Sequence, residues 1–175
     1  MPRTFHRIYV TRDAKQPHRG TLRAGHLRFP VALGRSGVVA RKAEGDGGTP
    51  KGTLPLRGVW FRPDKVRRPD TALPLRATRK DDLWVDAPDD RNYNRPVRAP
   101  YPASHENMWR GDDLYDYVVE LGWNDRPRKA GRGSAIFMHL ARPGFAPTEG
   151  CVALRRGDME KLLPFLGPDT VMVIR

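Results

Sequence analysis

The chain has 175 residues, of which 38% are hydrophobic and 30% charged, a balance that excludes a disordered protein and predicts one soluble globular domain over residues 1–175. The net charge is +12, and residues 1–80 carry 19 basic against 5 acidic residues. No stretch reaches the roughly 18 apolar residues of a membrane-spanning helix, so no transmembrane segment is expected.

Short strands dominate the first half of the predicted structure, because Pro and Gly together number 34 and break up longer elements. Alternating, β-rich segments predict strands at residues 5–11, 21–29, 31–34, 53–61 and 83–86. The first three predict a β-meander. Residues 38–52, with four glycines, predict a long hairpin loop without a Walker A spacing. Residues 88–102, with four prolines, predict an irregular loop that is long enough to carry function.

The second half predicts more strands and one helix. Strands are expected at residues 114–121, 134–140 and 170–174. Ser104 is a candidate N-cap for a short helical turn through Trp109. Apolar residues at helical spacing predict a helix over residues 158–166, kinked or shortened by Pro164. The chain is therefore expected to be mainly β with one or two short helices.

Cys151 is the only cysteine, and His139 lies twelve residues before it, at the end of an apolar run. A thiol becomes a strong nucleophile when a base or a cation lowers its pKa, so the two residues form a candidate catalytic pair. The alternative is that Cys151 is a small buried hydrophobe. The three N-terminal histidines lack metal-ligand spacing and predict no metal site: His6, His18 and His26.

Three motifs resemble the L,D-transpeptidase catalytic (YkuD) family of bacterial cell-wall enzymes. Residues 49–52 (TPKG) are similar to the family's Thr-Pro-x-Gly segment, and His139 to its strand histidine. Residues 148–151 (TEGC) resemble the Ser/Thr-His-Gly-Cys signature around the nucleophile, and residues 91–125 look like those of its short, single-domain members. The resemblance covers nearly the whole chain.

The resemblance implies a YkuD-like β-sandwich or barrel of mixed strands, with acyl transfer through a thioester on Cys151 and no cofactor. His139 would serve as the base, oriented by a backbone carbonyl. Backbone N–H groups around Gly150 would bind the oxyanion, with Thr148 hydrogen-bonded within the same turn. The implied substrate is a peptidoglycan stem peptide, which gives a role in cell-wall biogenesis and cell shape.

Two positions depart from the family pattern. Glu149 stands where the family usually has histidine, and Ala153 where it has Asn or Arg, while the loop between His139 and Cys151 is shorter than usual. Glu149 is left with three roles: orienting His139, binding a substrate amine, or facing solvent. Because the alanine at position 153 has no polar group for a substrate, the candidates to bind the substrate instead are Arg142, Arg155 and Arg156. For Arg155 and Arg156 the alternative is nonspecific surface charge.

Further candidates lie outside these motifs. His105 and Glu106 occupy a polar segment that can fold over a cleft, with a packed or solvated His105 as the alternative. The basic half invites an anionic partner such as nucleic acid, an acidic membrane surface or a wall polymer. No nucleic-acid-binding motif accompanies it, so no specific nucleic acid partner is expected, and basic composition also serves solubility.

Three functions stay open at this point: a transpeptidase, a hydrolase with the same cysteine and histidine, and a basic binding module with an idle thiol. The family acts outside the cytoplasmic membrane, which predicts the periplasm or cell envelope. The N-terminus has no apolar signal-peptide region. The alternatives are therefore a cytoplasmic protein or a sequence without its export signal.

Overall fold

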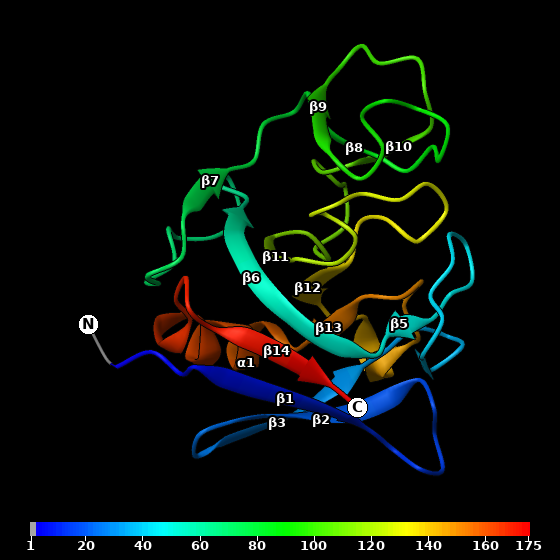
Figure 1. The fold of residues 1–175 in the computed structure, drawn as a ribbon. Helices are drawn as coiled ribbons and strands as arrows, with labels where there is room; N and C mark the ends of the chain where they lie inside the picture. The colour runs from blue at the N-terminus through cyan, green and yellow to red at the C-terminus, as the bar shows by residue number, and fades with distance from the viewer. Residues whose placement is uncertain (1–2) are drawn as a thin grey trace.

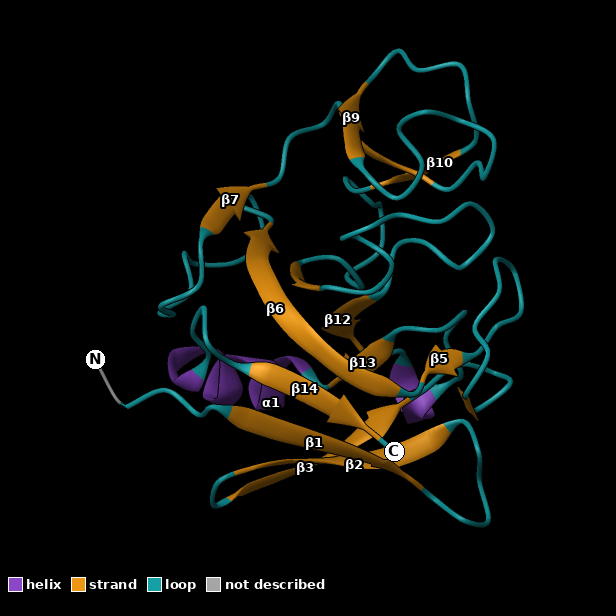
Figure 2. Cartoon of the chain, viewed as in Figure 1, coloured by secondary structure: helices purple, strands orange, loops and turns teal. Residues whose placement is uncertain are grey.

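A computed structural model describes residues 3–175, and most of its regular structure is strand (Figures 1 and 2). The strands are β1 (Arg7–Arg12), β2 (Arg19–Ala24), β3 (Leu27–Ala32), β4 (Val38–Val39), β5 (Thr49–Pro50), β6 (Gly52–Phe61), β7 (Leu75–Ala77), β8 (Asp82–Val85), β9 (Pro96–Arg98), β10 (His105–Asn107), β11 (Tyr117–Leu121), β12 (Phe137–Leu140), β13 (Val152–Leu154) and β14 (Val171–Ile174). The helical elements are α1 (Arg156–Leu162) and the 3-10 turns Pro143–Phe145 and Leu163–Phe165.

Nine strands form the main sheet, in the order β11-β12-β13-β3-β2-β1-β14-β6-β7. Because β11 also pairs with β6, the first eight strands close into a barrel. The ninth strand, β7, pairs with the C-terminal end of β6. The pairs β1–β14, β12–β13 and β6–β7 are parallel, and the other pairs of this sheet are antiparallel. Closure leaves few exposed strand edges. The predicted mixed β-barrel with few helices is therefore confirmed.

Alternation of side chains along the strands produces the core. In β1, for example, Ile8 and Val10 are buried while Arg7 and Thr11 are exposed. The α1 helix packs its apolar side against the same core, through Met159 and Leu162. Burying an aliphatic side chain of this size stabilises the fold by about 1.5–3 kcal/mol.

Several sequence-based predictions of local structure are wrong. The segment from Ser104 to Trp109 is not helical, because His105–Asn107 pairs as β10 with β8. The predicted hairpin loop over residues 38–52 contains the parallel pair β4–β5. The strand predicted over residues 21–29 turns at Gly25, where φ is +56°, so that Pro30 lies within β3.

The helix also differs from its prediction. It begins at Arg156 rather than at residue 158, and α-helical geometry ends at Leu162. The chain continues as a 3-10 turn through Pro164, whose ring nitrogen has no hydrogen to donate to an α-helical bond. Within residues 3–175, no helix has the length and apolar content needed to cross a membrane.

Candidate active site

The parallel pair β12–β13 brings the two ends of the Pro- and Gly-rich loop together. Met138 pairs with Val152 and His139 with Ala153, so Cys151 enters β13 beside β12. The backbone N–H of Phe137 donates to Cys151 Sγ over 3.4 Å. Phe137 and His139 are two residues apart on one strand and therefore share a face of the sheet. The strand pairing thus explains why a spacing of twelve residues places His139 near Cys151.

Cys151 and His139 both line a cavity of about 310 Å³. Loops from other parts of the chain complete its wall, and they contribute side chains of both charges. The charged side chains that line it include Lys42, Glu44, Asp86, Glu106, Arg110 and Arg142. The cavity therefore combines a thiol, an imidazole and charged groups of both signs.

His139 is held in one orientation. Its Nδ1 lies 2.9 Å from the backbone oxygen of Leu140, and the ring of Tyr115 packs edge-on at 5.3 Å between centroids. The side chain is 6% exposed, and burial lowers its pKa to about 4. At neutral pH the imidazole is neutral, and donation from Nδ1 to the carbonyl leaves Nε2 as the proton-accepting nitrogen.

The Cys151 thiol is also held neutral. It is 8% exposed, and its Sγ donates to the backbone oxygen of Ala135 over 3.3 Å. Burial raises its pKa to about 12, and the Glu106 carboxylate adds to this effect while the Phe137 N–H and Lys42 oppose it. No group among the described residues lowers the pKa of the thiol below its ordinary value, so the thiol is protonated at neutral pH. A neutral thiol and a neutral imidazole therefore both line the cavity at neutral pH.

Thr148 stabilises the turn before Cys151 through two hydrogen bonds within that turn. Its Oγ1 donates to the backbone oxygen of Cys151 over 2.7 Å and accepts from the Gly150 N–H over 3.1 Å. The hydrogen bonding predicted for Thr148 within the turn is therefore present. The Gly150 N–H is occupied, whereas the Cys151 N–H has no backbone acceptor within residues 3–175. Of these two N–H groups, the one on Gly150 is therefore already used within the turn.

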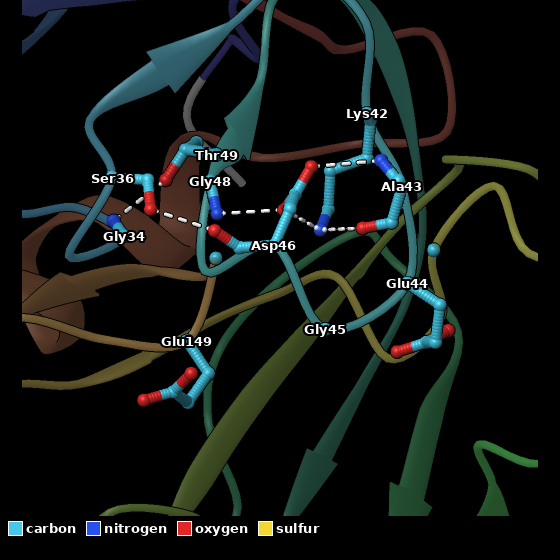
Figure 3. A network of polar contacts seen from close by, with 12 residues as sticks. Gly34, Ser36, Lys42, Ala43, Glu44, Gly45, Asp46, Gly48, Thr49 and Glu149 are labelled. Carbon is cyan, nitrogen blue, oxygen red and sulfur yellow. Dashed lines mark hydrogen bonds and ion pairs between the residues drawn. The ribbon is translucent and has the colours of Figure 1, made fainter.

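A second loop, residues 42–49, packs against this turn, and Figure 3 shows its internal hydrogen bonds. The Asp46 carboxylate accepts a hydrogen bond from Lys42 Nζ. It also accepts from the backbone N–H of Ala43 over 2.7 Å and from that of Gly48 over 2.8 Å. The backbone oxygen of Gly48 lies against Gly150, where an added Cβ would approach it to 2.7 Å. The glycine-rich segment seen in the sequence is therefore a support for the cysteine turn.

Thr49, the first residue of the Thr-Pro-x-Gly segment, fixes the start of that support. Its buried Oγ1 accepts from the Gly34 N–H over 2.8 Å. We expect Thr49→Ala to lower the free energy of unfolding by about 1–3 kcal/mol, because a buried N–H loses its acceptor. Thr53→Ala, at an exposed position of β6, is the control and should change it by less than about 0.5 kcal/mol. Urea unfolding measures both, and equal effects would contradict this role of Thr49.

The structure separates the other predicted site residues. Glu149 is exposed and pairs with Arg35 over 2.7 Å, which places its carboxylate at the rim of the cavity. Arg142 is exposed and also lines the cavity. Glu106 accepts from Tyr115 Oη over 2.7 Å inside the cavity, and burial raises its pKa. His105 does not line the cavity, because its Nδ1 lies 2.7 Å from the backbone oxygen of Ala103.

Several cavity residues were not found from the sequence. Tyr115 packs on His139, Glu44 accepts from Ser134 Oγ over 2.8 Å, and Asp86 has a buried Oδ1 without a hydrogen-bond partner among the described residues. They belong to separate loops far from Cys151 in the chain. Only Glu44 lies in a segment that the sequence singled out, the glycine-rich loop over residues 38–52. Within residues 3–175, no cluster of three or more His, Cys, Asp or Glu side chains is suited to hold a metal.

The buried imidazole predicts an acid-sensitive fold. Above about pH 6.5, His139 is neutral in the folded and unfolded chain. Below that pH the unfolded chain takes up a proton, whereas the folded chain does so only near pH 4. The free energy of unfolding should therefore fall by about 3 kcal/mol between pH 6.5 and 4 because of this group. Urea titrations of wild type and His139→Gln test it, and a difference between the two that is independent of pH would contradict it.

Comparison with protein-family models matches residues 7–174 to YkuD, the L,D-transpeptidase catalytic domain. Because the match spans almost the whole chain, the protein belongs to this family, as the sequence motifs indicated. Membership supports an enzyme of L,D-transpeptidase type acting on peptidoglycan-related substrates. Neither a curated protein nor a solved structure matches the chain.

Proposed function

We propose that this protein is a cysteine acyltransferase that carries out L,D-transpeptidation on peptidoglycan stem peptides. The proposal is supported by one observation: Cys151 and His139 line the same cavity in a domain of this family. A buried histidine with a fixed ring orientation suits proton transfer. Since peptidoglycan lies outside the cytoplasmic membrane, the proposal also places the protein in the cell envelope.

In the first half of the reaction, Cys151 Sγ attacks the carbonyl carbon of the bond between an L-centre and a D-amino acid. Its proton passes to Nε2 of His139 as the carbon–sulfur bond forms. The tetrahedral intermediate then expels the amine of the D-amino acid, which takes the proton from His139 and leaves a thioester. Because both groups start neutral, substrate binding has to precede ionisation.

In the second half, the amine of another stem peptide attacks the thioester carbon. His139 accepts a proton from that amine and returns it to the departing sulfur, so the enzyme is restored and an amide links the two peptides. The Cys151 N–H is the proposed oxyanion donor. Thr148 and Gly150 are proposed to hold that donor in place rather than to contact the oxyanion.

The carboxylates of the cavity suit an ammonium group on the substrate. Burial raises the pKa of Glu106, and the nearby Asp86 and Glu44 add to this effect. A bound cation offsets the cost of a buried negative charge. Glu106 is therefore proposed to bind a substrate ammonium inside the cavity, while Glu149 and Arg142 contact the peptide at the rim.

Glu106→Gln is expected to raise the KM for a peptide with a free amine by about tenfold, because a charge-assisted hydrogen bond is removed. The same peptide with that amine acetylated should show no such change. Glu160→Gln is the control, since its side chain is exposed and does not line the cavity. Equal rises in KM for the free and acetylated peptides would exclude ammonium binding by Glu106.

Product analysis on isolated disaccharide-tetrapeptides tests the reaction type, with Cys151→Ala as the inactive control. We expect cross-linked dimers together with free D-amino acid. Formation of tripeptide without any dimer would instead identify a hydrolase that passes the acyl group to water. No product from the folded wild type would contradict both enzyme functions and favour a binding module.

A further inference from the structure

One group of strands in the barrel contains basic residues and no acidic residue, while exposed Asp13 lies in the turn between β1 and β2. Five neighbouring strands, β3, β2, β1, β14 and β6, form this part of the sheet, and β1, β2, β3 and β14 run side by side in Figure 2. None of the five contains an Asp or a Glu. The chain has 20 acidic residues, and all of them lie outside these five strands.

The register places these arginines together on the outer surface. Tyr9 of β1 pairs with Arg23 of β2, and Arg23 pairs with Arg28 of β3. Arg7 lies two residues before Tyr9 and pairs with Val171. Arg7, Arg23 and Arg28 are exposed, whereas the alternate residues of these strands face the core.

This arrangement is costly without an anion. Like charges directly opposite each other on paired strands destabilise a sheet, and Arg23 faces Arg28 in that way. Within residues 3–175, Arg7, Arg23 and Arg28 form no ion pair. Surface arginines outside these strands do have carboxylate partners, such as Arg98 with Asp81 and Arg110 with Asp112.

We propose that this outer face, defined by Arg7, Tyr9, Arg23, Arg28 and Arg175, docks on an anionic phospholipid surface. Strands about 4.8 Å apart spread these charges over a width of roughly 14 Å, enough to contact several headgroups at once. Each arginine near such a surface strengthens binding about fivefold. Tyrosine with neighbouring valines is a composition that suits the interfacial layer of a bilayer.

The environment of Tyr9 favours lipid over nucleic acid. Single-stranded nucleic acids are bound by aromatic rings on which bases stack. The guanidinium of Arg175 lies 5.1 Å from the centroid of the Tyr9 ring and covers it. None of the residues that line the catalytic cavity comes from these five strands. Docking through the outer face therefore leaves the cavity open to substrate.

Sedimentation with vesicles tests this proposal on the whole protein. Wild type should bind vesicles with 30% phosphatidylglycerol but not pure phosphatidylcholine, more weakly as salt rises. Arg23→Gln with Arg28→Gln should weaken binding roughly 20-fold. The control exchanges two exposed arginines of the β6–β7 loop, Arg67 and Arg68, and changes the net charge equally.

Unchanged thermal melting of both double variants shows that they are folded. The same partition of wild type between anionic and neutral vesicles would overturn the proposal. Equal losses in the two double variants would also overturn it, because net charge rather than this face would then be responsible. Displacement from vesicles by a short DNA duplex at equal phosphate concentration would identify the face as a nucleic acid surface instead.

Discussion

Replacement of His139 by glutamine is expected to lower kcat for acyl transfer by about 1,000-fold, the scale on which a positioned general base contributes. The effect should be this large because burial raises the pKa of the Cys151 thiol to about 12, so that almost no thiolate exists at neutral pH without a base. Nε2 of His139 is the acceptor that the Leu140 carbonyl leaves free. Single-turnover rates on a stem peptide measure the loss.

His105→Gln is the matched control for this substitution. His105 is a histidine of the same chain, but it does not line the cavity and its Nδ1 is bonded to Ala103. Its kcat should stay within about twofold of wild type. A His139→Gln variant that keeps more than a tenth of the wild-type kcat would show that another group takes the thiol proton.

Gly150→Ala is expected to remove activity and to destabilise the protein. Gly150 has φ of +139°, a conformation that residues with a Cβ rarely adopt. The added methyl group would also lie 2.7 Å from the backbone oxygen of Gly48, which the Asp46 carboxylate fixes through the Gly48 N–H. The turn must therefore shift, and the Cys151 N–H moves with it. We expect a loss of unfolding free energy of about 2–4 kcal/mol.

The control for this variant is Gly157→Ala in α1. No atom lies within 4 Å of the added Cβ at position 157, and alanine favours a helix. This exchange should stabilise the protein by up to about 1 kcal/mol and leave kcat unchanged. Calorimetry and initial rates on the two variants provide the comparison, and a stable, active Gly150→Ala protein would contradict the requirement for glycine.

The sequence predicted the fold well where the signal is local. Alternating residues identified the strands around Val10 and Val59, and the Cys151 turn was recognised by its motif. Pairing between distant segments carries no such local signal. The closure of the barrel through β11 and β6 and the strand made by His105 therefore appear only in three dimensions.

The candidate site shows the same division. Cys151 and His139 were predicted because a lone cysteine follows a histidine closely in the sequence and both match family motifs. Tyr115 and Asp86 reach the cavity from other loops, and nothing in their neighbouring residues marks them. The pKa of the thiol depends on its burial and on the Glu106 carboxylate, neither of which a motif describes. The sequence therefore proposes which residues react, whereas their burial and protonation state required the structure.

Covalent trapping of Cys151, followed by intact mass spectrometry, tests most directly whether this residue is the nucleophile. A carbapenem is an acyl donor that a nucleophilic thiol of this type opens to form a stable thioester. We predict one adduct per wild-type chain, mapped to the peptide that contains Cys151, and none on Cys151→Ala. A folded wild-type protein that forms no adduct, or an adduct that persists on Cys151→Ala, would contradict the assignment of Cys151 as the nucleophile.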